Sequence, residues 1–177
     1  VDRAEIEVET ENFSGEVDYA ILTQSGETLW HSREKKLKVS AQRLSARPWR
    51  PEEPNRYVLR VRLMNGGEVV DEEQVLFGFR TAEFNADGFY LNGEKFFLRG
   101  LNRHQSFPYI GYAATESLQR EDARILKEEL HCTAVRTSHY PQSQYFIDEC
   151  DKLGLLVFTE IPGWQHIGDA QWKEQAC

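Results

Sequence analysis

The sequence is poor in the residues and runs that mark several classes of protein. Only three of its 177 residues are cysteines, and none of them forms a Cys-x-x-Cys pair. An odd number of widely spaced cysteines argues against a disulfide framework, so we expect Cys132 and Cys150 to be buried free thiols. No apolar run approaches the roughly 20 residues of a membrane-spanning helix. These absences point away from a disulfide scaffold and from a helical membrane protein.

Positive charge is also in deficit. The chain has 21 Lys and Arg residues against 29 Asp and Glu residues, which gives a net charge of −8. This balance disfavours nucleic acid or an anionic membrane as the main partner. The remaining composition, 40% hydrophobic and 28% charged, is typical of a globular protein that buries a sizeable core.

Residues 1–84 show the alternation of apolar and polar residues that is typical of β-strands. The stretches "AEIEVET", "KKLKVSA" and "YVLRVRLM" alternate at every second position. Asn65-Gly66-Gly67 supplies the positive φ of a tight hairpin, and the Pro-rich residues 47–57 can form neither a helix nor a central strand. Short alternating strands separated by turns predict an antiparallel β-sandwich.

Residues 85–177 follow a different pattern, in which a hairpin with Asn92-Gly93 at its tip precedes alternating strands and helices. We expect strands in "FLRGLN", "TAVRTS" and "LLVFTE", the last apolar on both faces, and helices in "TESLQREDARILKEEL", "PQSQYFIDECDKLG" and "AQWKEQA". Pro141 suits the first turn of the second helix, Gly154 its end, and Asp169 the start of the third. The alternation predicts parallel βα units. The residues expected to face the core from the first two helices are Leu118, Ile125, Leu126, Leu130, Phe146, Cys150 and Leu153.

Polar residues gather where each of the three predicted strands ends. The clusters are Asn102, Arg103 and His104, then Arg136, Ser138, His139 and Tyr140, then Glu160. In a parallel α/β barrel the carboxyl ends of the strands meet at the face that carries the active site. Three clusters in register therefore predict a binding or catalytic site there.

These motifs resemble glycoside hydrolase family 2, the family of β-galactosidases and β-glucuronidases. The resemblance begins at "WRPEEPNRYVLRV" and continues through "FGFR", "FYLNGEKFFLRGLNRH", "REDARILKEEL", "VRTSHYP" and "CDKLGLLVFTE". It implies an immunoglobulin-like β-sandwich over residues 1–84, followed over residues 85–177 by about the first three βα units of a (β/α)8 TIM barrel. "NRHQ" and "TEIPGWQHIGD" are more similar to the galactosidase branch than to β-glucuronidases, in which "NKHE" is usual.

The resemblance also implies roles for individual residues. His104 and His139 match histidines that line the sugar site, and Asn102 matches a polar residue beside it. Arg136 matches an arginine that holds the nucleophilic carboxylate ionised, and Glu160 matches a supporting acid. Trp164, just past a strand end, is either a core aromatic or a platform for a sugar ring.

No cofactor is expected for these residues. Some galactosidases of the family bind magnesium through a Glu-x-His pair after the third strand, but this chain has Trp164-Gln165-His166 there. A hard cation prefers oxygen ligands, so a magnesium site is disfavoured. A zinc site would have to use residues whose spacing matches no recurrent ligand pattern, namely Cys132, His104, His139 and His166.

The catalytic carboxylates of the family are missing. A retaining glycosidase needs two of them, about 5–5.5 Å apart. In the family the acid/base lies in an Asn-Glu pair that ends the fourth strand and the nucleophile ends the seventh, and the chain contains no Asn-Glu pair. We therefore expect both residues to lie beyond Cys177, and the chain to be an inactive fragment of an enzyme that cleaves β-galactosides.

The expected partners are a carbohydrate substrate of the complete enzyme and, through the exposed edges of a partial barrel, a second copy of the chain. Two alternatives stay open. The complete protein is a β-glucuronidase or another family 2 glycosidase, or the chain is a non-catalytic carbohydrate-binding or interaction module. No signal-like segment follows Val1, which leaves the cytoplasm and the periplasm of a bacterium both possible.

Overall fold

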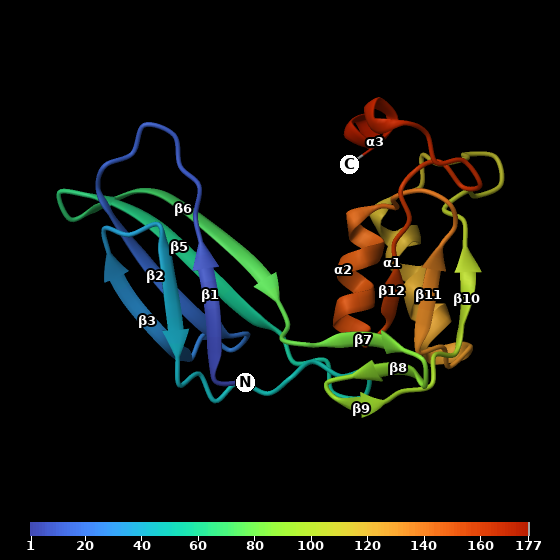
Figure 1. The fold of residues 1–177 in the computed structure, drawn as a ribbon, viewed down its shortest axis with the longest axis horizontal. Helices are drawn as coiled ribbons and strands as arrows, with labels where there is room; N and C mark the ends of the chain where they lie inside the picture. Colours follow the sequence, from blue (N-terminus) through green and yellow to red (C-terminus); the bar gives the residue numbers. More distant parts are fainter. Residues whose placement is uncertain (177) are drawn as a thin grey trace. The chain divides into compact units, whose positions relative to one another are not determined.

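The computed structural model describes residues 1–176 and divides the chain into two compact units (Figure 1). The first unit comprises residues 1–49 and 55–81, and the second comprises residues 50–54 and 82–177. No helix within residues 1–176 is both long enough and apolar enough to cross a bilayer.

The first unit is a β-sandwich. Its larger sheet is antiparallel, with the strand order β3-β2-β5-β6, and its smaller sheet pairs β1 with β4. The strands are β1 (Arg3–Glu7), β2 (Glu16–Thr23), β3 (Thr28–Glu34), β4 (Lys38–Gln42), β5 (Tyr57–Asn65) and β6 (Glu68–Phe77). The predicted turn at Asn65 joins β5 to β6, with positive φ at Gly66 and Gly67.

Alternation places the apolar side chains of both sheets in one core. Ile6 and Val39 come from the smaller sheet, and Val17, Tyr19 and Ile21 come from the larger one. Tyr19 is fully buried, and its hydroxyl donates to the carbonyl of Lys36 at 2.7 Å. Ion pairs of this unit lie outside the core, for example Lys38 with Glu7.

The second unit begins with an antiparallel sheet of β7 (Ala82–Asn85), β8 (Gly88–Leu91) and β9 (Glu94–Lys95). Asn92 and Gly93 join β8 to β9 with positive φ, as predicted. A parallel sheet follows, with the order β10 (Gly100–Arg103), β11 (Ala134–Thr137) and β12 (Leu156–Phe158). Helix α1 (Glu116–Arg124), extended by a π-helical turn (Ile125–Glu129), follows β10, and α2 (Gln144–Leu153) follows β11. The predicted parallel βα order is therefore confirmed.

A second apolar core lies between this sheet and its helices. It contains Ala123 and Leu126 from α1 and its extension, Val135 from β11, and Phe146 and Cys150 from α2. Cys132 also belongs to this core, so the prediction that Cys132 and Cys150 are buried free thiols is confirmed.

The ends of the helices follow the sequence in part. Gly154 ends α2 in the left-handed conformation, and Asp169 accepts a hydrogen bond from the amide of Trp172 at 2.9 Å in α3 (Ala170–Ala176). Pro141, in contrast, precedes α2, whose N-cap is Ser143.

Two predictions about buried faces were wrong. Leu118 and Leu130 are exposed, because the buried stripe of α1 passes instead through Gln119 and Ala123. Phe158 is 38% exposed, because it faces away from the helices, and its only ring contact within residues 1–176 is with Phe84 of β7, at 5.9 Å.

Arg103 explains why a glutamine is buried on α1. Its guanidinium donates to Asp122 at 2.7 and 2.9 Å, to Gln119 at 2.7 Å and to Gln142 at 2.6 Å. The same group lies 3.9 Å from the ring centroid of Phe146. Arg103 thus ties the end of β10 to α1 and to the segment that leads into α2.

The Pro-rich segment 50–54 packs within the second unit. Pro51 is buried, and its carbonyl accepts a hydrogen bond at 2.9 Å from Lys127, which also donates to the carbonyl of Gly154 at 2.9 Å. A Cβ atom on Gly154 would lie 2.2 Å from the Pro51 oxygen. Burial lowers the pKa of Lys127, and its two carbonyl partners supply the hydrogen bonds that the buried ammonium needs.

Candidate functional site

The register of the parallel sheet decides which polar side chains meet. Asn102 lies opposite Arg136, and Arg136 lies opposite Phe158. Successive side chains of a strand point to opposite faces, so Arg103 and Thr137 lie on the face that packs against the helices. Arg103 was grouped with the strand-end cluster from the sequence, but the structure places it in the buried network behind the sheet.

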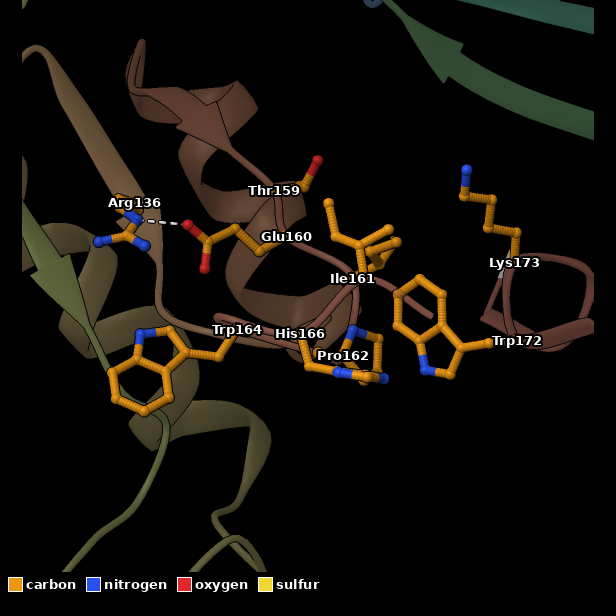
Figure 2. Close-up of a pocket in the computed structure, with 11 residues that line it drawn as sticks. Arg136, Thr159, Glu160, Ile161, Pro162, Trp164, His166, Trp172 and Lys173 are labelled. Atoms are coloured by element: carbon orange, nitrogen blue, oxygen red, sulfur yellow. Dashed lines mark hydrogen bonds and ion pairs between the residues drawn. The ribbon is translucent and has the colours of Figure 1, made fainter. Parts of the chain in front are cut away.

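Arg136, His139 and Glu160 form one polar cluster after β11 and β12. Arg136 Nε donates to a carboxylate oxygen of Glu160 (Figure 2). His139 Nδ1 lies 3.2 Å from the other oxygen of Glu160 and 3.3 Å from Arg136 Nη2. A proton on Nδ1 would be donated to Glu160, which leaves Nε2 as an acceptor.

Glu160 is held in its ionised form. The hydrogen bond from Arg136 keeps the pKa of Glu160 below its ordinary value, and the charge of Arg136 and the hydrogen bond with His139 act in the same direction. The cluster therefore presents a fixed carboxylate and a guanidinium that still has N–H donors for a second acidic group.

Thr137 fixes the position of Glu160 and was not predicted. Its buried hydroxyl donates to the carbonyl of Phe158 at 3.1 Å and accepts from the amide of Glu160 at 3.2 Å. A hydroxyl residue at a position of β11 that alternation places on the buried face, next to the outward-facing Arg136, was the signal that could have revealed this link.

Aromatic rings extend from this cluster in both directions. The ring of His139 lies 5.4 Å from that of Trp164 and 5.5 Å from that of His104. His104 in turn lies 6.0 Å from the ring of Tyr140, whose hydroxyl is 3.4 Å from His104 Nδ1. His104, His139 and Trp164 are thus joined by ring contacts, and Tyr140, from the same predicted strand-end clusters, extends this row of rings.

Tyr140 is the ring of this row that contacts the following loop. Its hydroxyl accepts from the amide of Gln105 at 3.3 Å, and its ring lies 5.6 Å from that of Tyr112. Burial, followed by the hydrogen bond with Tyr112, raises the pKa of Tyr140. The phenol therefore stays neutral at ordinary pH.

A cavity of about 510 Å³ opens beside the polar cluster. Arg136, Glu160 and Trp164 line one part of it, and His166, Trp172 and Lys173 line another (Figure 2). A mainly apolar hollow with a few convergent polar groups is the usual form of a small-molecule site.

Asn102 lies apart from this cavity. It lines a smaller hollow of about 260 Å³, together with Leu101, Phe158 and Arg136. Of these residues, Arg136 also lines the larger cavity. The structure therefore connects Asn102 to the cluster through Arg136 and not directly.

No group of three or more His, Cys, Asp or Glu side chains within residues 1–176 could hold a metal ion. Of the four residues weighed for zinc, Cys132 lies in the apolar core, away from the strand-end cluster that contains His139.

The two units match two family models. Residues 83–175 match the model described as "Glycosyl hydrolases family 2, TIM barrel domain", and residues 2–80 match the model described as "Glycosyl hydrolases family 2". These matches cover nearly the whole chain.

Similar proteins include glycosidases of two specificities. A β-galactosidase of Thermoanaerobacterium thermosulfurigenes is 58% identical over 128 residues, which are 72% of this chain and 18% of that protein. A putative β-glucuronidase of Formosa agariphila is 39% identical over 127 residues, 71% of this chain and 15% of that protein. The solved structure of a β-glycosidase from Bacteroides vulgatus has a TM-score of 0.81 at 28% identity, and the match covers 99% of this chain and 25% of that one. The matched part of the chain thus spans less than a fifth of the length of the β-galactosidase and of the putative β-glucuronidase.

Proposed function

The chain belongs to glycosyl hydrolase family 2, and we propose that it supplies the sandwich domain and the first three βα units of the catalytic barrel to a retaining enzyme that cleaves terminal β-galactosides. About 30 residues form one unit of a (β/α)8 barrel, so the three strand–helix pairs after β9 correspond to its first three units. The complete protein would add the remaining units.

The observation that carries the proposal is the cluster of Arg136, His139 and Glu160 at the carboxyl ends of parallel strands. In a retaining glycosidase the nucleophilic carboxylate must stay ionised until it attacks the sugar. Glu160 fixes the guanidinium of Arg136, whose remaining N–H groups then stabilise that second carboxylate by charge-assisted hydrogen bonds.

We assign the neighbouring rings to the sugar. His139 and His104 present ring nitrogens for hydroxyl groups, and Trp164, which is 67% exposed, presents an aromatic face beside the cavity. A hydrogen bond that strengthens as charge develops on the sugar accelerates the chemical step more than it tightens binding.

A β-galactoside is preferred over a β-glucuronide as the substrate. The β-galactosidase relative is 58% identical and the putative β-glucuronidase 39% identical over segments of nearly equal length. The test is to assay the complete protein with nitrophenyl β-galactoside and nitrophenyl β-glucuronide. Faster turnover of the glucuronide would overturn the proposed specificity, and turnover of neither would overturn the proposed function.

The 177-residue chain by itself should not hydrolyse either substrate, because double displacement requires two carboxylates on opposite sides of the bond, about 5–5.5 Å apart. Turnover by a pure preparation of residues 1–177 that is lost in Glu160→Gln would contradict this expectation.

We also propose that residues 1–177, when prepared alone, associate with a second copy. Leu101 is 51% exposed and Phe97 is 84% exposed, and Phe158 lies beside Leu101 in the smaller hollow. An apolar face of this kind is usually covered by another element. Light scattering over a dilution series should show a dimer or larger species, and a monomer at all concentrations would contradict the proposal.

A further inference from the structure

The segment between β12 and α3 makes a sharp turn beside the cavity. The amide of His166 donates a hydrogen bond of 2.7 Å to the carbonyl of Gly163, and both Gly163 and Trp164 have positive φ. A residue with a side chain rarely adopts the left-handed φ of 46° found at Trp164, and such a conformation persists only where the surroundings hold it. The direction of the Trp164 ring therefore depends on what packs against this turn.

The indole of Trp172 packs against the backbone on both sides of Trp164. A Cβ atom on Gly163 would lie 2.8 Å from the ring of Trp172, and one on Gly168 would lie 2.6 Å from the Cβ and Cγ atoms of Trp172. The ring of His166 meets the indole edge to face, with 6.0 Å between the ring centroids. Since a side chain at either glycine would collide with Trp172, the two glycines allow the indole to lie directly on the turn.

Helix α3 holds Trp172 in place. The amide of Trp172 donates to Asp169 Oδ1 at 2.9 Å, and the amide of Lys173 donates to the carbonyl of Asp169 at 3.1 Å. Both tryptophans line the cavity, but Trp164 is exposed whereas Trp172 is half-buried (Figure 2). Within residues 1–176 the two indoles make no ring contact with each other. Trp172 therefore acts on Trp164 through the backbone of the turn.

We propose that Trp172 is a positioning residue, which holds the turn so that the ring of Trp164 faces the sugar. The ring of Trp164 lies 5.4 Å from that of His139, and the proposed function assigns both rings to the sugar. Stacking requires that the aromatic face keeps its orientation and its contact, so a tilt of the turn would weaken the stacking while the ring of Trp164 is still present. The inference rests on the proposed glycosidase function and adds a residue that acts on the sugar through another residue.

The first test measures kcat and KM of the complete enzyme with nitrophenyl β-galactoside. Trp172→Ala should raise KM about 5- to 10-fold and leave kcat within about twofold, because a displaced stacking ring loses binding that the ground state and the transition state share. Trp172→Phe keeps a ring beside Gly168 and should raise KM by less than about threefold. Gly168→Ala displaces the indole without removing it and should raise KM as Trp172→Ala does. It tests the same contact if Trp172→Ala does not fold.

The second test is a double-mutant cycle with Trp164, which separates positioning from a general effect on the fold. Trp164→Ala should raise KM by a similar factor, and adding Trp172→Ala to this variant should raise KM no further, because the two residues act as one. A further rise of about 5- to 10-fold in the double variant would show that Trp172 acts on the sugar or on the fold independently of Trp164. That result would overturn the inference.

Gln171→Ala is the matched control, because Gln171 is the exposed neighbour of Trp172 in α3 and does not line the cavity. It should leave kcat and KM unchanged. An unchanged KM in Trp172→Ala and Gly168→Ala, or an equal rise in Gln171→Ala, would overturn the inference and leave the proposed function intact. Failure of the unchanged enzyme on nitrophenyl β-galactoside and nitrophenyl β-glucuronide would overturn the proposed function, and the inference with it.

Discussion

The two units of the chain differ in where they place charged and polar side chains. The sandwich buries apolar groups and keeps its ion pairs, such as Arg3 with Glu5, on the surface. The α/β unit buries Arg103 and Gln119 and holds them with hydrogen bonds. Desolvating a charge is costly unless the charge is fully paired. Buried polar groups of this kind therefore indicate where side chains must keep a fixed orientation. In this chain they lie directly behind the strand ends that carry the candidate site.

The sharpest test of this difference is to remove one arginine from each unit. Arg103→Leu should destabilise the α/β unit by about 3 kcal/mol or more, because Asp122, Gln119 and Gln142 lose their common partner. Arg62→Leu removes the Arg62–Glu72 pair of the sandwich and should cost less than about 1 kcal/mol. Hydrogen exchange of the amides in β11 and in β2 would measure the two units separately. Equal effects would contradict the contrast.

Histidines allow the same comparison for function. His139→Ala in the complete enzyme should lower kcat roughly 100-fold with little change in KM, since the ring is proposed to act mainly in the transition state. His31→Ala is the control from the sandwich, where His31 Nε2 lies 2.6 Å from Asp18. It should leave kcat unchanged. Unchanged turnover in His139→Ala would remove His139 from the site.

Alanine substitutions at two glycines with positive φ allow the cost of backbone strain to be measured separately from the cost of a steric clash. Gly26→Ala, in the turn between β2 and β3, meets no atom within 4 Å and should cost only the left-handed strain, about 1 to 2 kcal/mol. Gly154→Ala should cost clearly more, because its Cβ would lie 2.2 Å from the carbonyl oxygen of Pro51. Urea unfolding followed by hydrogen exchange would give both values. Similar costs would show that segment 50–54 moves aside easily.

The smallest expected effect concerns two carboxylates. The pKa of Glu160 is lowered mainly by its hydrogen bond with Arg136, and that of Glu5 mainly by its hydrogen bond with Arg3. A lowered pKa stabilises the fold above the ordinary value of 4.5, and this contribution is lost as the pH falls through the folded value. NMR titration should therefore place both midpoints below 4.5.

Salt should separate these two midpoints. Raising the salt concentration should move the Glu5 midpoint towards 4.5 more than that of Glu160, because the Glu5 side chain is 48% exposed and the Glu160 side chain 26% exposed. Arg136→Gln should raise the Glu160 midpoint. Equal salt shifts would show that the two pairs are equally solvated.

Local patterns were sufficient for much of the fold. The alternation around Leu59 and Val61, the turns at Gly66 and Asn92, and the end of α2 at Gly154 each depend on a few neighbouring residues. The parallel order followed from the alternation of strands and helices.

Features that depend on distant residues were missed. Gln119 is buried because Arg103 needs an acceptor, and this contact outweighs the helical periodicity that favoured Leu118. No pattern signalled that Pro51 packs beside Gly154, about a hundred residues away in the sequence. The closeness of Arg136, His139 and Glu160 was predictable, because strand ends meet at one edge of a parallel sheet. The separation of Asn102 from the cavity could not be predicted from the sequence, because it depends on the register of the sheet and on the shape of the folded chain.

The positions of the cysteines allow the opening of the α/β unit to be measured separately from that of the sandwich. Residues 1–131 contain no cysteine, whereas Cys132 and Cys150 are both buried in the core of the α/β unit. Burial raises the pKa of the Cys150 thiol, so an alkylating reagent meets a reactive thiolate only after this core opens. The rate of alkylation at Cys150, measured by mass spectrometry, therefore reports how often the core of the α/β unit opens. The sandwich has no cysteine and contributes no alkylation signal.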